Sequence, residues 1–560
     1  MSLYETRREQ MFPALSEAQM EVVKRLAGCD VQEHPPNALL YSIGDRQVPA
    51  YFVVSGTVDV HRHDGAGLKN VITHYGPGSF TGELSQLTGR RALADAHAGK
   101  EGCKVLALDA EHLRTLVIGS ADIGELVMRA FILRRTALIA EHSAGPVLVG
   151  PAGSADLVAL ENLLARNGFP YTTLDSETDA EGKALVEKFF ITDADLPIAL
   201  CPDGELLKRP TEAELAACLE ITAEFDSDKL FDVAIVGAGP AGLAAAVYGA
   251  SEGLSMIVLD ARSFGGQAGA SARIENYLGF PTGISGHALA ARAYTQALKF
   301  GAQIVIPSEV DVLDCKPSVQ DGEPLKLTLK NGREILARSV VIASGARYRR
   351  LDVPNLDELE GAGVHYWASP IEARLCAGEE VALIGAGNSA GQAVVYLSGH
   401  VKRLHLVIRS DGLEASMSKY LIDRIKALPN VELHTQTEVT ALEGDRERGL
   451  SSVTFRDRKS QELKTVAMRH LFLFIGADPN TAWLESCAAQ LDNKGFVRTG
   501  VDIERKESNG RPHPMALETS IPRVFAVGDV RSGSTKRVAA AVGDGASVVA
   551  QIHALLAQNV

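Results

Sequence analysis

Among the residues whose type and spacing indicate chemistry, the glycines of G237-A-G-P-A-G242 are the most informative. In such a stretch the first glycine permits a tight turn, the second lets the backbone approach a pyrophosphate, and the third lets a helix pack on a strand. An apolar strand comes before it, a small-residue helix and a second strand come after it, and the acid that follows can accept hydrogen bonds from a ribose. We therefore predict a dinucleotide site. Its expected contacts are Gly237, Gly239, Pro240, Ala241, Gly242 and Asp260.

A second stretch of this kind, G385-A-G-N-S-A390, also lies between an apolar strand and a helix. Two such units in one chain usually bind two dinucleotides. The strand that follows ends at Ile408 and Arg409, and an arginine suits a ribose 2′-phosphate better than a free 2′-hydroxyl. We predict NADPH here; in the alternative, NADH binds and Arg409 is only a solvated charge. The expected contacts are Gly385, Gly387, Asn388, Ser389, Ala390 and Arg409.

Two further segments place polar residues near the first fingerprint. SFGGQAGASARIENYLGFP follows it, and a later segment ends an apolar strand with G528-D529. With both fingerprints, these segments give residues 231–560 a resemblance to low-molecular-weight thioredoxin reductases. The resemblance implies FAD on the first fingerprint, an NADPH domain inserted into the FAD domain, a homodimer, and a domain rotation that presents NADPH to the flavin. The further FAD contacts that it implies are Gly266, Gln267, Asn276, Gly345, Gly528, Asp529, Arg537 and Val538.

The segment VHYWASPIEAR, residues 364–374, departs from this resemblance. The family has a C-x-x-C redox pair, whose cysteines would fall on Ala368 and Ile371. Neither side chain can carry electrons. Cys376 has no second cysteine within a C-x-x-C span and is expected to be a buried apolar side chain. The lone His365 is expected to be a surface or packing residue, so no catalytic residue is predicted.

Composition excludes several classes of protein. A formal net charge of −14 argues against nucleic acid, whose phosphates need clustered lysine and arginine. Polar residues interrupt the apolar stretches before the roughly 18 residues needed to cross a bilayer, and the charged N-terminus lacks the apolar core of a signal peptide. The seven cysteines include no C-x-x-C, which excludes a disulfide scaffold and a thiolate zinc site, so no metal is predicted. We expect a cytoplasmic protein without a membrane partner.

The residue pattern of the first part of the chain predicts an amphipathic helix at 14–30, closely spaced strands with glycine turns, and a long helix at 121–142. Such strands are typical of an antiparallel barrel or jelly roll. YFVVSGTV (51–58), G82-E-L-S and RRALA (90–94) resemble the cyclic-nucleotide-binding family. The resemblance implies that a Glu binds the ribose 2′-hydroxyl and an Arg pairs with the cyclic phosphate. The implied contacts are Gly82, Glu83, Leu84 and Arg91, with Arg90 as an alternative; in a barrel without nucleotide, Glu83 and Arg91 would pair with each other.

Residues 144–224 are expected to alternate strand, helix, strand, helix, strand, D-G turn, strand and helix. This order resembles a glutaredoxin or thioredoxin fold, with Pro197 at the position of that fold's cis-proline. The fold's redox C-x-x-C would lie near Pro151–Asp156, where PAGSAD contains no cysteine. Both segments in which the resemblances imply a redox C-x-x-C, residues 368–371 and 151–156, therefore lack cysteine. This is expected if electrons leave the protein by another route.

Together these elements predict a multidomain protein of α/β and β parts. The expected domains are a cyclic-nucleotide-binding-like jelly roll at 1–143, a thioredoxin-like module at 144–224, a Rossmann-like FAD domain at 229–347 and 474–560, and a Rossmann-like NAD(P)H domain at 348–473. The predicted function is that of an FAD-dependent NAD(P)H oxidoreductase that passes electrons to a quinone, dioxygen, a ferric complex or another carrier. The alternatives are a disulfide reductase with cysteines not recognised from the sequence, and a flavin-loaded sensor of cyclic nucleotide or redox state.

Overall fold

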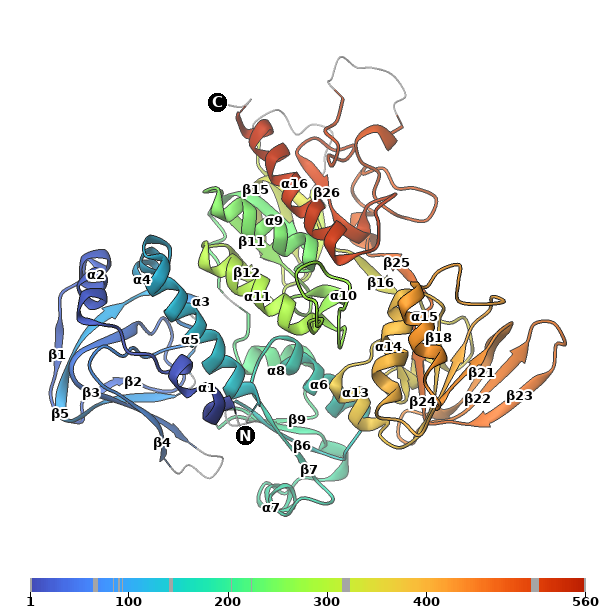
Figure 1. Ribbon diagram of the computed structural model, residues 1–560, viewed down its shortest axis with the longest axis horizontal. Coiled ribbons are helices and arrows are strands. Elements are labelled where there is room, and N and C mark those ends of the chain that lie inside the picture. The colour runs from blue at the N-terminus through green and yellow to red at the C-terminus, as the bar shows by residue number, and fades with distance from the viewer. Residues whose placement is uncertain are drawn as a thin grey trace. The chain divides into compact units, whose positions relative to one another are not determined.

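The computed structural model describes the 560-residue chain apart from short segments (Figure 1). The described residues are 3–63, 69–83, 85–88, 91–92, 94–140, 145–202, 204–222, 224–314, 323–504 and 513–557. The chain divides into two compact units. Unit 1 contains Met1–Pro151, Asn167–Phe225 and Thr295–Pro307, and unit 2 contains Ala152–Arg166, Asp226–Tyr294 and Ser308–Val560.

An antiparallel sheet forms the N-terminal part of unit 1, with strand order β1-β5-β3-β4 and β2 paired to β5. Successive side chains of a strand point to opposite faces, so β3 contributes Phe52 to one apolar core and Tyr51 and Val53 to another. Both faces of the sheet are buried, which agrees with the predicted barrel or jelly roll. The strands are β1 (Gln32–His34), β2 (Leu39–Tyr41), β3 (Ala50–His63), β4 (Lys69–Tyr75) and β5 (Asp95–Leu108).

Helices cover the face of this sheet that carries Phe52. The helix predicted at 14–30 is α2, which begins with a capping box: the Ser16 hydroxyl accepts from the Gln19 N–H, and the Gln19 side chain accepts from the Ser16 N–H. The helix predicted at 121–142 is α5. The sequence analysis did not predict α1 or α4. The bounds are α1 (Leu3–Met11), α2 (Glu17–Ala27), α3 (Ser85–Thr88), α4 (Ala110–Gly119) and α5 (Ala121–Ala140).

The next part of the chain alternates strands and helices in the predicted order. Its sheet has the order β7-β6-β8-β9, with β7 parallel to β6, and with β8 and β9 antiparallel to the strands before them. The Leu196–Pro197 bond is cis, as the resemblance to a thioredoxin fold implies. The elements are β6 (Val147–Gly150), α6 (Ala155–Arg166), β7 (Thr172–Asp175), α7 (Ala180–Lys188), η1 (Asp193–Asp195), β8 (Ile198–Leu200), β9 (Leu206–Lys208) and α8 (Glu212–Cys218).

Cys201, which follows β8, and Cys218, at the end of α8, form a disulfide with a Cα–Cα distance of 6.6 Å. Cys487 is disulfide-bonded as well. The expectation of reduced cysteines therefore does not hold for these residues. Their spacing gave no signal, because 17 residues separate Cys201 from its partner. The free cysteines among the described residues are Cys29, Cys103 and Cys376.

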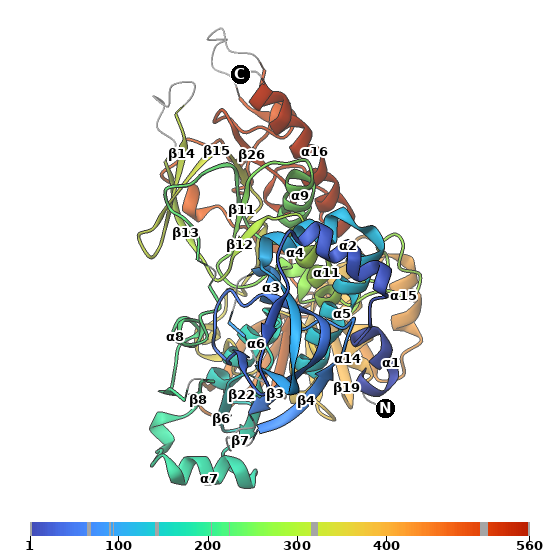
Figure 2. The same cartoon turned by 90° about the vertical axis from the view of Figure 1, so that its left-hand side faces the viewer.

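The first glycine fingerprint follows β10 of a mostly parallel sheet in unit 2 (Figure 2). Strand β10 lies between β11 and β15 and is parallel to both, while β26 is parallel to the second half of β15. Helix α9 follows the fingerprint, and α16 lies alongside it. The bounds are β10 (Leu230–Val236), α9 (Pro240–Ser251), β11 (Met256–Leu259), α10 (Gly266–Gly269), α11 (Gly286–Lys299), β12 (Gln303–Val305), β13 (Val310–Asp314), β14 (Leu325–Leu329), β15 (Glu334–Ile342), β26 (Val524–Ala526) and α16 (Val538–Ala557).

Among the described helices, α16 alone has the length and apolar composition to cross a membrane. Its side chains include the carboxylate of Asp544, which accepts hydrogen bonds from the Gly528 N–H at 3.1 Å and from Arg531 Nε at 3.2 Å. Val548 and Ile552 of α16 are fully buried. The buried side chains of α16 pack against α9.

The second glycine fingerprint belongs to a separate parallel sheet, with strand order β17-β24-β18-β19-β20. All five strands lie between β15 and β26 in the chain, so this sheet is inserted into the first, as the resemblance to thioredoxin reductases implies. Strand β18 contributes Leu383 to a core with α14 and α15, and Ile384 to a core with the antiparallel sheet β21-β22-β23.

The remaining elements surround this inserted sheet or follow it. Their bounds are β16 (Ala346–Tyr348), α12 (Leu356–Leu359), β17 (Val364–His365), α13 (Pro370–Leu375), β18 (Glu380–Ile384), α14 (Asn388–Ser398), β19 (Arg403–Val407), α15 (Lys419–Lys426), β20 (Val431–His434), β21 (Thr437–Asp445), β22 (Gly449–Asp457), β23 (Leu463–Ala467), β24 (His470–Leu473), β25 (Ala477–Pro479), η2 (Ala482–Leu484), η3 (Gly500–Asp502) and η4 (Gly528–Val530).

Candidate functional site

A cavity of about 590 Å³ in unit 2 brings residues of both glycine fingerprints together, and we call it the fingerprint cavity. Small-molecule and cofactor sites usually measure roughly 300–1,000 Å³. The predicted residues that line it are Gly239, Pro240, Ala241, Asp260, Gly266, Gln267, Asn276, Gly345, Asn388, Ser389, Asp529, Arg537 and Val538. The predicted residues that do not line it are Gly237, Gly242, Gly385, Gly387, Ala390, Arg409 and Gly528.

The three glycines of the first fingerprint have different roles. Gly237 has φ +115°, and a Cβ there would lie 2.2 Å from the Ala343 carbonyl oxygen. A Cβ on Gly242 would lie 1.9 Å from the Gly237 carbonyl oxygen, so both positions admit only glycine. Gly239 is the N-cap of α9, and the nearest atom to a Cβ there is Gly266 Cα, 3.9 Å away. Its backbone is open to a phosphate at the N-terminus of α9.

Asp260 orients the glycine turn. Its Oδ2 accepts a hydrogen bond from the Ala238 N–H at 2.9 Å, and its Oδ1 accepts from the N–H groups of Arg262 and Ser263 at 3.0 and 3.1 Å. The side chain also lines the cavity. Because each carboxylate oxygen can accept more than one hydrogen bond, Asp260 can hold the turn and still accept from a ribose hydroxyl.

The turn before α10 closes onto the first fingerprint. Gly266 has φ +54°, and a Cβ there would lie 3.1 Å from Gly239 Cα. Gln267 Nε2 donates to the Ala346 carbonyl oxygen at 2.5 Å, which ties α10 to β16. Residues that are more than a hundred positions apart, such as Gly239 and Gly345, therefore reach the same cavity.

Lys536 is a cavity residue that the sequence analysis missed, although it precedes the predicted Arg537. Its Nζ donates to the Asp529 carbonyl oxygen and, at 2.7 Å, to Ser534 Oγ, and it lies 4.3 Å from the centre of the Phe496 ring. Burial lowers the pKa of Lys536 and raises the pKa of Asp529. The Lys536 ammonium and the Arg537 guanidinium give this side of the cavity cations that suit an anionic ligand.

The glycines of the second fingerprint also have different roles. Gly385 has φ +147°, and a Cβ there would lie 2.4 Å from the Phe474 carbonyl oxygen, so it shapes the turn. Gly387 is the N-cap of α14, and nothing described lies within 4 Å of the position of its Cβ. Asn388 lines the cavity, and its Oδ1 accepts from the Ser418 N–H at 2.7 Å. The N-terminus of α14 is thus open to a second nucleotide.

Arg409 lies two residues beyond β19 and is exposed. Its carbonyl oxygen accepts a hydrogen bond from Arg458 Nη1 at 3.1 Å, which places a second arginine next to it. Arg458 Nε is also 3.8 Å from Glu438 Oε2. The sequence analysis missed Arg458 because 49 residues separate it from Arg409.

The segment at residues 364–374 forms part of the cavity wall through Trp367 and Ala368. Ala368 and Ile371, the two positions at which the sequence resemblance predicts a redox cysteine pair, are 6% and 8% exposed. Trp367 Nε1 donates to Glu372 Oε1 at 2.9 Å, and Glu372 itself is buried. These contacts fix the Trp367 indole at the cavity wall.

Helix α6 packs against this wall within unit 2. Glu161 accepts two hydrogen bonds from Arg374 Nη2, at 3.2 and 3.3 Å. The Arg166 guanidinium lies 5.5 Å from the centre of the Trp367 ring, within the range of a cation–π interaction, and donates to the Gly266 carbonyl oxygen at 3.3 Å. Arg166, which no sequence motif singles out, therefore joins the Trp367 wall to the turn before α10.

Two other residues named from the sequence in this region are buried and unreactive. Burial raises the pKa of the Cys376 thiol to about 11, so almost none of it is the nucleophilic thiolate at neutral pH. His365 Nε2 lies 3.1 Å from His470 Nδ1, and its ring centre is 4.9 Å from that of Phe472. Burial lowers the pKa of His365 to about 3. Both residues have the packing roles expected from the sequence.

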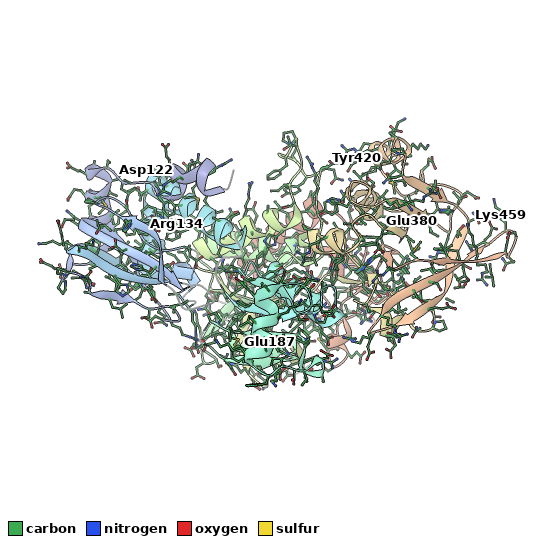
Figure 3. All side chains as sticks on the ribbon, turned by 90° about the horizontal axis from the view of Figure 1, so that it is seen from below. Asp122, Arg134, Glu187, Glu380, Tyr420 and Lys459 are labelled. Atoms are coloured by element: carbon green, nitrogen blue, oxygen red, sulfur yellow. A yellow bond between two sulfur atoms is a disulfide. The ribbon has the colours of Figure 1, made fainter. Side chains whose placement is uncertain are left out.

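In unit 1, α5 holds the turn that the resemblance assigns to a ribose. Arg134, labelled in Figure 3, is 5% exposed and donates to the carbonyl oxygens of Phe80 and Gly82 at 3.1 and 2.8 Å. The next residue of α5, Arg135, places its Nη1 3.4 Å from Glu83 Oε2. The predicted contacts Gly82 and Glu83 are therefore fixed by two adjacent arginines of one helix.

Arg91, the implied phosphate ligand, pairs with Glu220, two residues beyond α8. Arg91 Nε donates to Glu220 Oε2 at 2.8 Å, and Arg91 Nη2 donates to Glu220 Oε1. Arg46 pairs with the same carboxylate. The alternative in which Glu83 pairs with Arg91 is wrong, because each has a different partner. The predicted Leu84 and the alternative Arg90 lie outside the described residues.

Two family models match the chain. One, described as pyridine nucleotide-disulphide oxidoreductase, matches residues 231–545, and the other, described as cyclic nucleotide-binding domain, matches residues 31–119. Thioredoxin reductase from Treponema pallidum is 34% identical over 316 residues, which cover 56% of this chain and 94% of that protein. NADH dehydrogenase from Ferdinandcohnia aciditolerans is 27% identical over 417 residues, which cover 74% of this chain and 69% of that protein.

A solved structure, thioredoxin reductase from Lactococcus lactis in the FR conformation, resembles the chain with a TM-score of 0.52 and 26% identity. The match covers 59% of this chain and 99% of that one. The chain spans only 62% and 58% of the lengths of two other curated relatives. Residues 231–545, matched by the pyridine nucleotide-disulphide oxidoreductase model, include all the residues that line the fingerprint cavity.

Proposed function

The chain belongs to the pyridine nucleotide-disulphide oxidoreductase family, and from that premise we propose that it is an FAD-dependent NAD(P)H oxidoreductase whose electron acceptor is not a thiol. FAD, when bound, takes a hydride from the nicotinamide and passes electrons onward. The observation that carries the proposal is the wall of the fingerprint cavity. Trp367 and Ala368 line this wall, and in the proposed correspondence with the family Ala368 and Ile371 would replace its two redox cysteines.

The residues of the cavity fit FAD. The open backbone of Gly239 at the N-terminus of α9 would receive the pyrophosphate, and Asp260 would accept from the ribose. Lys536 and Arg537 would stabilise negative charge on the bound cofactor. The missing Cβ of Gly239 is the critical feature, since a larger side chain there would project into the space that a phosphate needs.

The second fingerprint would bind the nicotinamide coenzyme, with its pyrophosphate at the N-terminus of α14 beside Gly387. Arg409 and Arg458 together would pair with a 2′-phosphate, which favours NADPH over NADH. Asn388 would position the phosphates, because Ser418 already fixes its side chain.

The lining of the cavity favours a planar acceptor. Trp367, Tyr348, Tyr420 and Phe474 all line it, and flat rings stack on aromatic side chains. Among the acceptors considered from the sequence, a quinone fits this lining better than a ferric complex, whose charged ligands would need polar contacts. Dioxygen is small enough to reach the cavity in either case.

Steady-state oxidation of NADPH tests the proposal. The purified protein is given, in separate assays, dichlorophenolindophenol, a soluble quinone, thioredoxin or dioxygen alone. We expect rapid turnover with the dye and the quinone and no thioredoxin-dependent rate. Thioredoxin-dependent turnover would identify a disulfide reductase instead, and negligible turnover with every acceptor would identify a sensor.

One observation favours a second candidate, reduction of a disulfide within the chain. The Cys201–Cys218 pair is a disulfide that the sequence analysis did not recognise. Anaerobic addition of NADPH followed by a thiol count separates the candidates. An increase of two thiols per chain, absent in Cys201→Ser, would show that electrons reach this pair. We expect no increase, because neither Trp367 nor Ala368 of the cavity wall can relay electrons to it.

The barrel is proposed to bind a cyclic nucleotide that regulates the enzyme. The supporting observation is the charge arrangement at Arg91, whose guanidinium is held by the Glu220 carboxylate in the way a phosphate would be held. A nucleotide phosphate must displace Glu220, and through it the segment after α8. Binding at the barrel would therefore be coupled to a movement of that segment.

The assembly and location of the protein rest on the family alone. The resemblance to thioredoxin reductases supports a homodimer. Sedimentation equilibrium at several concentrations tests this, since a monomer at all concentrations would contradict it. A cytoplasmic location is proposed on the same ground, and fractionation of cells tests it.

A further inference from the structure

At the edge of the inserted sheet, we propose that His405, Glu432 and His434 form a binding site for a divalent transition-metal ion such as Zn²⁺. Nothing in the oxidoreductase function requires this site, and none of the three residues lines the fingerprint cavity. The sequence analysis predicted no metal because it considered thiolate spacings only.

The parallel pairing of two strands brings the three side chains together. His405 lies on β19 opposite Glu432 on β20, and His434 lies opposite Val407. Residues two apart on a strand point to the same face, so His405, Glu432 and His434 project from one face of the sheet. Since β20 is an edge strand, the cluster lies where an ion can enter from solvent.

The ligand atoms are spaced as a tetrahedral ion requires. His405 Nδ1 is 3.0 Å from His434 Nε2 and 3.5 Å from Glu432 Oε2, and His434 Nε2 is 3.9 Å from Glu432 Oε2. Ligands at about 2.0–2.1 Å from a tetrahedral zinc ion are separated from one another by roughly 3.4 Å. Three such atoms around one point leave a fourth position for water.

The chemistry of the donors fits the same ions. Two imidazoles and one carboxylate are a known zinc ligand set, and imidazole also suits Cu²⁺ and Ni²⁺. The two oxygens of the Glu432 carboxylate have different partners. Oε1 accepts from Arg403 Nη1, and Oε2 faces the histidines. The arginine therefore orients the carboxylate without using the oxygen that would bind the ion.

The far nitrogen of His405 provides an independent observation. His405 Nε2 is buried and has no hydrogen-bond partner among the described residues, and the closest carboxylate oxygen reported for it is Glu380 Oε2 at 3.8 Å. Ligation through Nδ1 would put the proton on Nε2, directed at the carboxylate of Glu380, labelled in Figure 3. Metal-bound histidines almost always donate their other ring N–H to a carboxylate, a backbone carbonyl or water. Lys402 holds Glu380 in place through a hydrogen bond of 3.0 Å.

The bound ion would link the edge strand β20 to β19, because its ligands come from both strands. Without an ion, the two strands are joined by backbone pairing and by the hydrogen bond between His405 and His434. An ion that binds the folded chain raises its stability by mass action. Metal binding should therefore raise the Tm of the protein.

The test uses the full-length protein without an affinity tag, treated with a chelator and dialysed. Titration calorimetry with ZnCl₂ should give one ion per chain. Replacement of His405 or His434 by Gln should weaken binding at least tenfold, and Glu432→Gln should do the same without disturbing the fold, since Glu432 is exposed. His400→Gln, at an exposed histidine in the same sheet region, is the control and should bind as the wild type does.

Cobalt gives a second readout that a nonspecific surface ion would not show. Co²⁺ in the wild type should produce the strong visible absorption of a tetrahedral site, and the three variants should lose it. The proposal is overturned if the wild type binds no ion, or if all three variants bind as tightly as the His400→Gln control. Flavin content and circular dichroism of each variant show that it has folded.

Discussion

Two of the three nucleotide sites named from the sequence, the FAD site and the barrel, differ in what their residues contact. In the fingerprint cavity, Lys536 and Arg537 line open space, and Gly239 leaves the α9 N-terminus uncovered. In the barrel, Arg91 is paired with Glu220 and Glu83 with Arg135. At Gly239 a phosphate can approach the backbone without displacing a side chain, whereas a phosphate at Arg91 must displace a carboxylate. The first arrangement suits a permanent cofactor, and the second suits a regulated ligand.

The largest expected effect is the loss of bound FAD when a side chain fills the open space at Gly239. Gly239→Val would place a branched side chain at the N-terminus of α9, in the space proposed for the pyrophosphate. The purified variant should contain almost no FAD, while the wild type contains roughly one per chain, as measured by absorbance after heat release. Gly543→Ala in α16, where a Cβ meets nothing within 4 Å, is the control and should keep its flavin. A fully loaded Gly239→Val would show that the fingerprint does not bind FAD.

The next effect concerns the coenzyme. Arg409→Ala should reduce the preference for NADPH over NADH in relative kcat/KM by roughly 10- to 100-fold, since a charge-assisted hydrogen bond contributes about 1.5–3 kcal/mol. Arg458→Ala should act in the same direction, because Arg458 donates to the Arg409 carbonyl oxygen. The NADH rate of both variants should stay close to that of the wild type. Equal use of both coenzymes by the wild type would mean that the two arginines are only surface charges.

A smaller effect is expected at the barrel. Glu220→Gln removes the negative charge that competes for Arg91, so fluorescent cyclic AMP or cyclic GMP should bind more tightly. Coupling of this kind is usually about 1–3 kcal/mol, or roughly 5- to 150-fold. Glu224→Gln is the matched control, because Glu224 pairs with Arg46, whereas Arg91 pairs with Glu220. Equal affinity of the two variants would show that Glu220 does not compete, and absence of binding to both would show that the barrel binds no cyclic nucleotide.

Local patterns predicted the parts of the site that are local in the chain. The Gly237 and Gly385 turns, α2 and α5 were predicted because each depends on a few neighbouring residues. Arg458, Arg166 and Glu220 were missed for the opposite reason, since each reaches its partner from a distant segment.

The Cys201–Cys218 disulfide and the His405–Glu432–His434 cluster were missed in the same way. Each depends on how strands or helices pair, which spacing does not reveal. The absence of a C-x-x-C from residues 364–374 could be read directly from the sequence, because such a pair is a motif of four consecutive residues.

Blocking the free thiols is expected to have the smallest effect, which is no change in the NADPH-to-dye rate. If Trp367 and Ala368 form a wall without redox chemistry, electrons reach the acceptor without a cysteine. Alkylation of the wild type near neutral pH should leave its NADPH-to-dye rate unchanged, since the pKa of Cys376 is raised to about 11 by burial and its thiolate is scarce. The variant Cys376→Ala should keep most of this rate.

Alkylation that abolishes turnover while FAD and circular dichroism are unchanged would contradict this expectation. The same treatment of Cys376→Ala then identifies the thiol: a resistant variant would assign electron transfer to Cys376. A variant that is still inhibited would assign it to a different cysteine, and Cys201→Ser would test the pair that forms the disulfide. Because Cys376 and Cys201 are separate positions with separate variants, the two results distinguish the buried thiol at the end of α13 from a dithiol elsewhere in the chain.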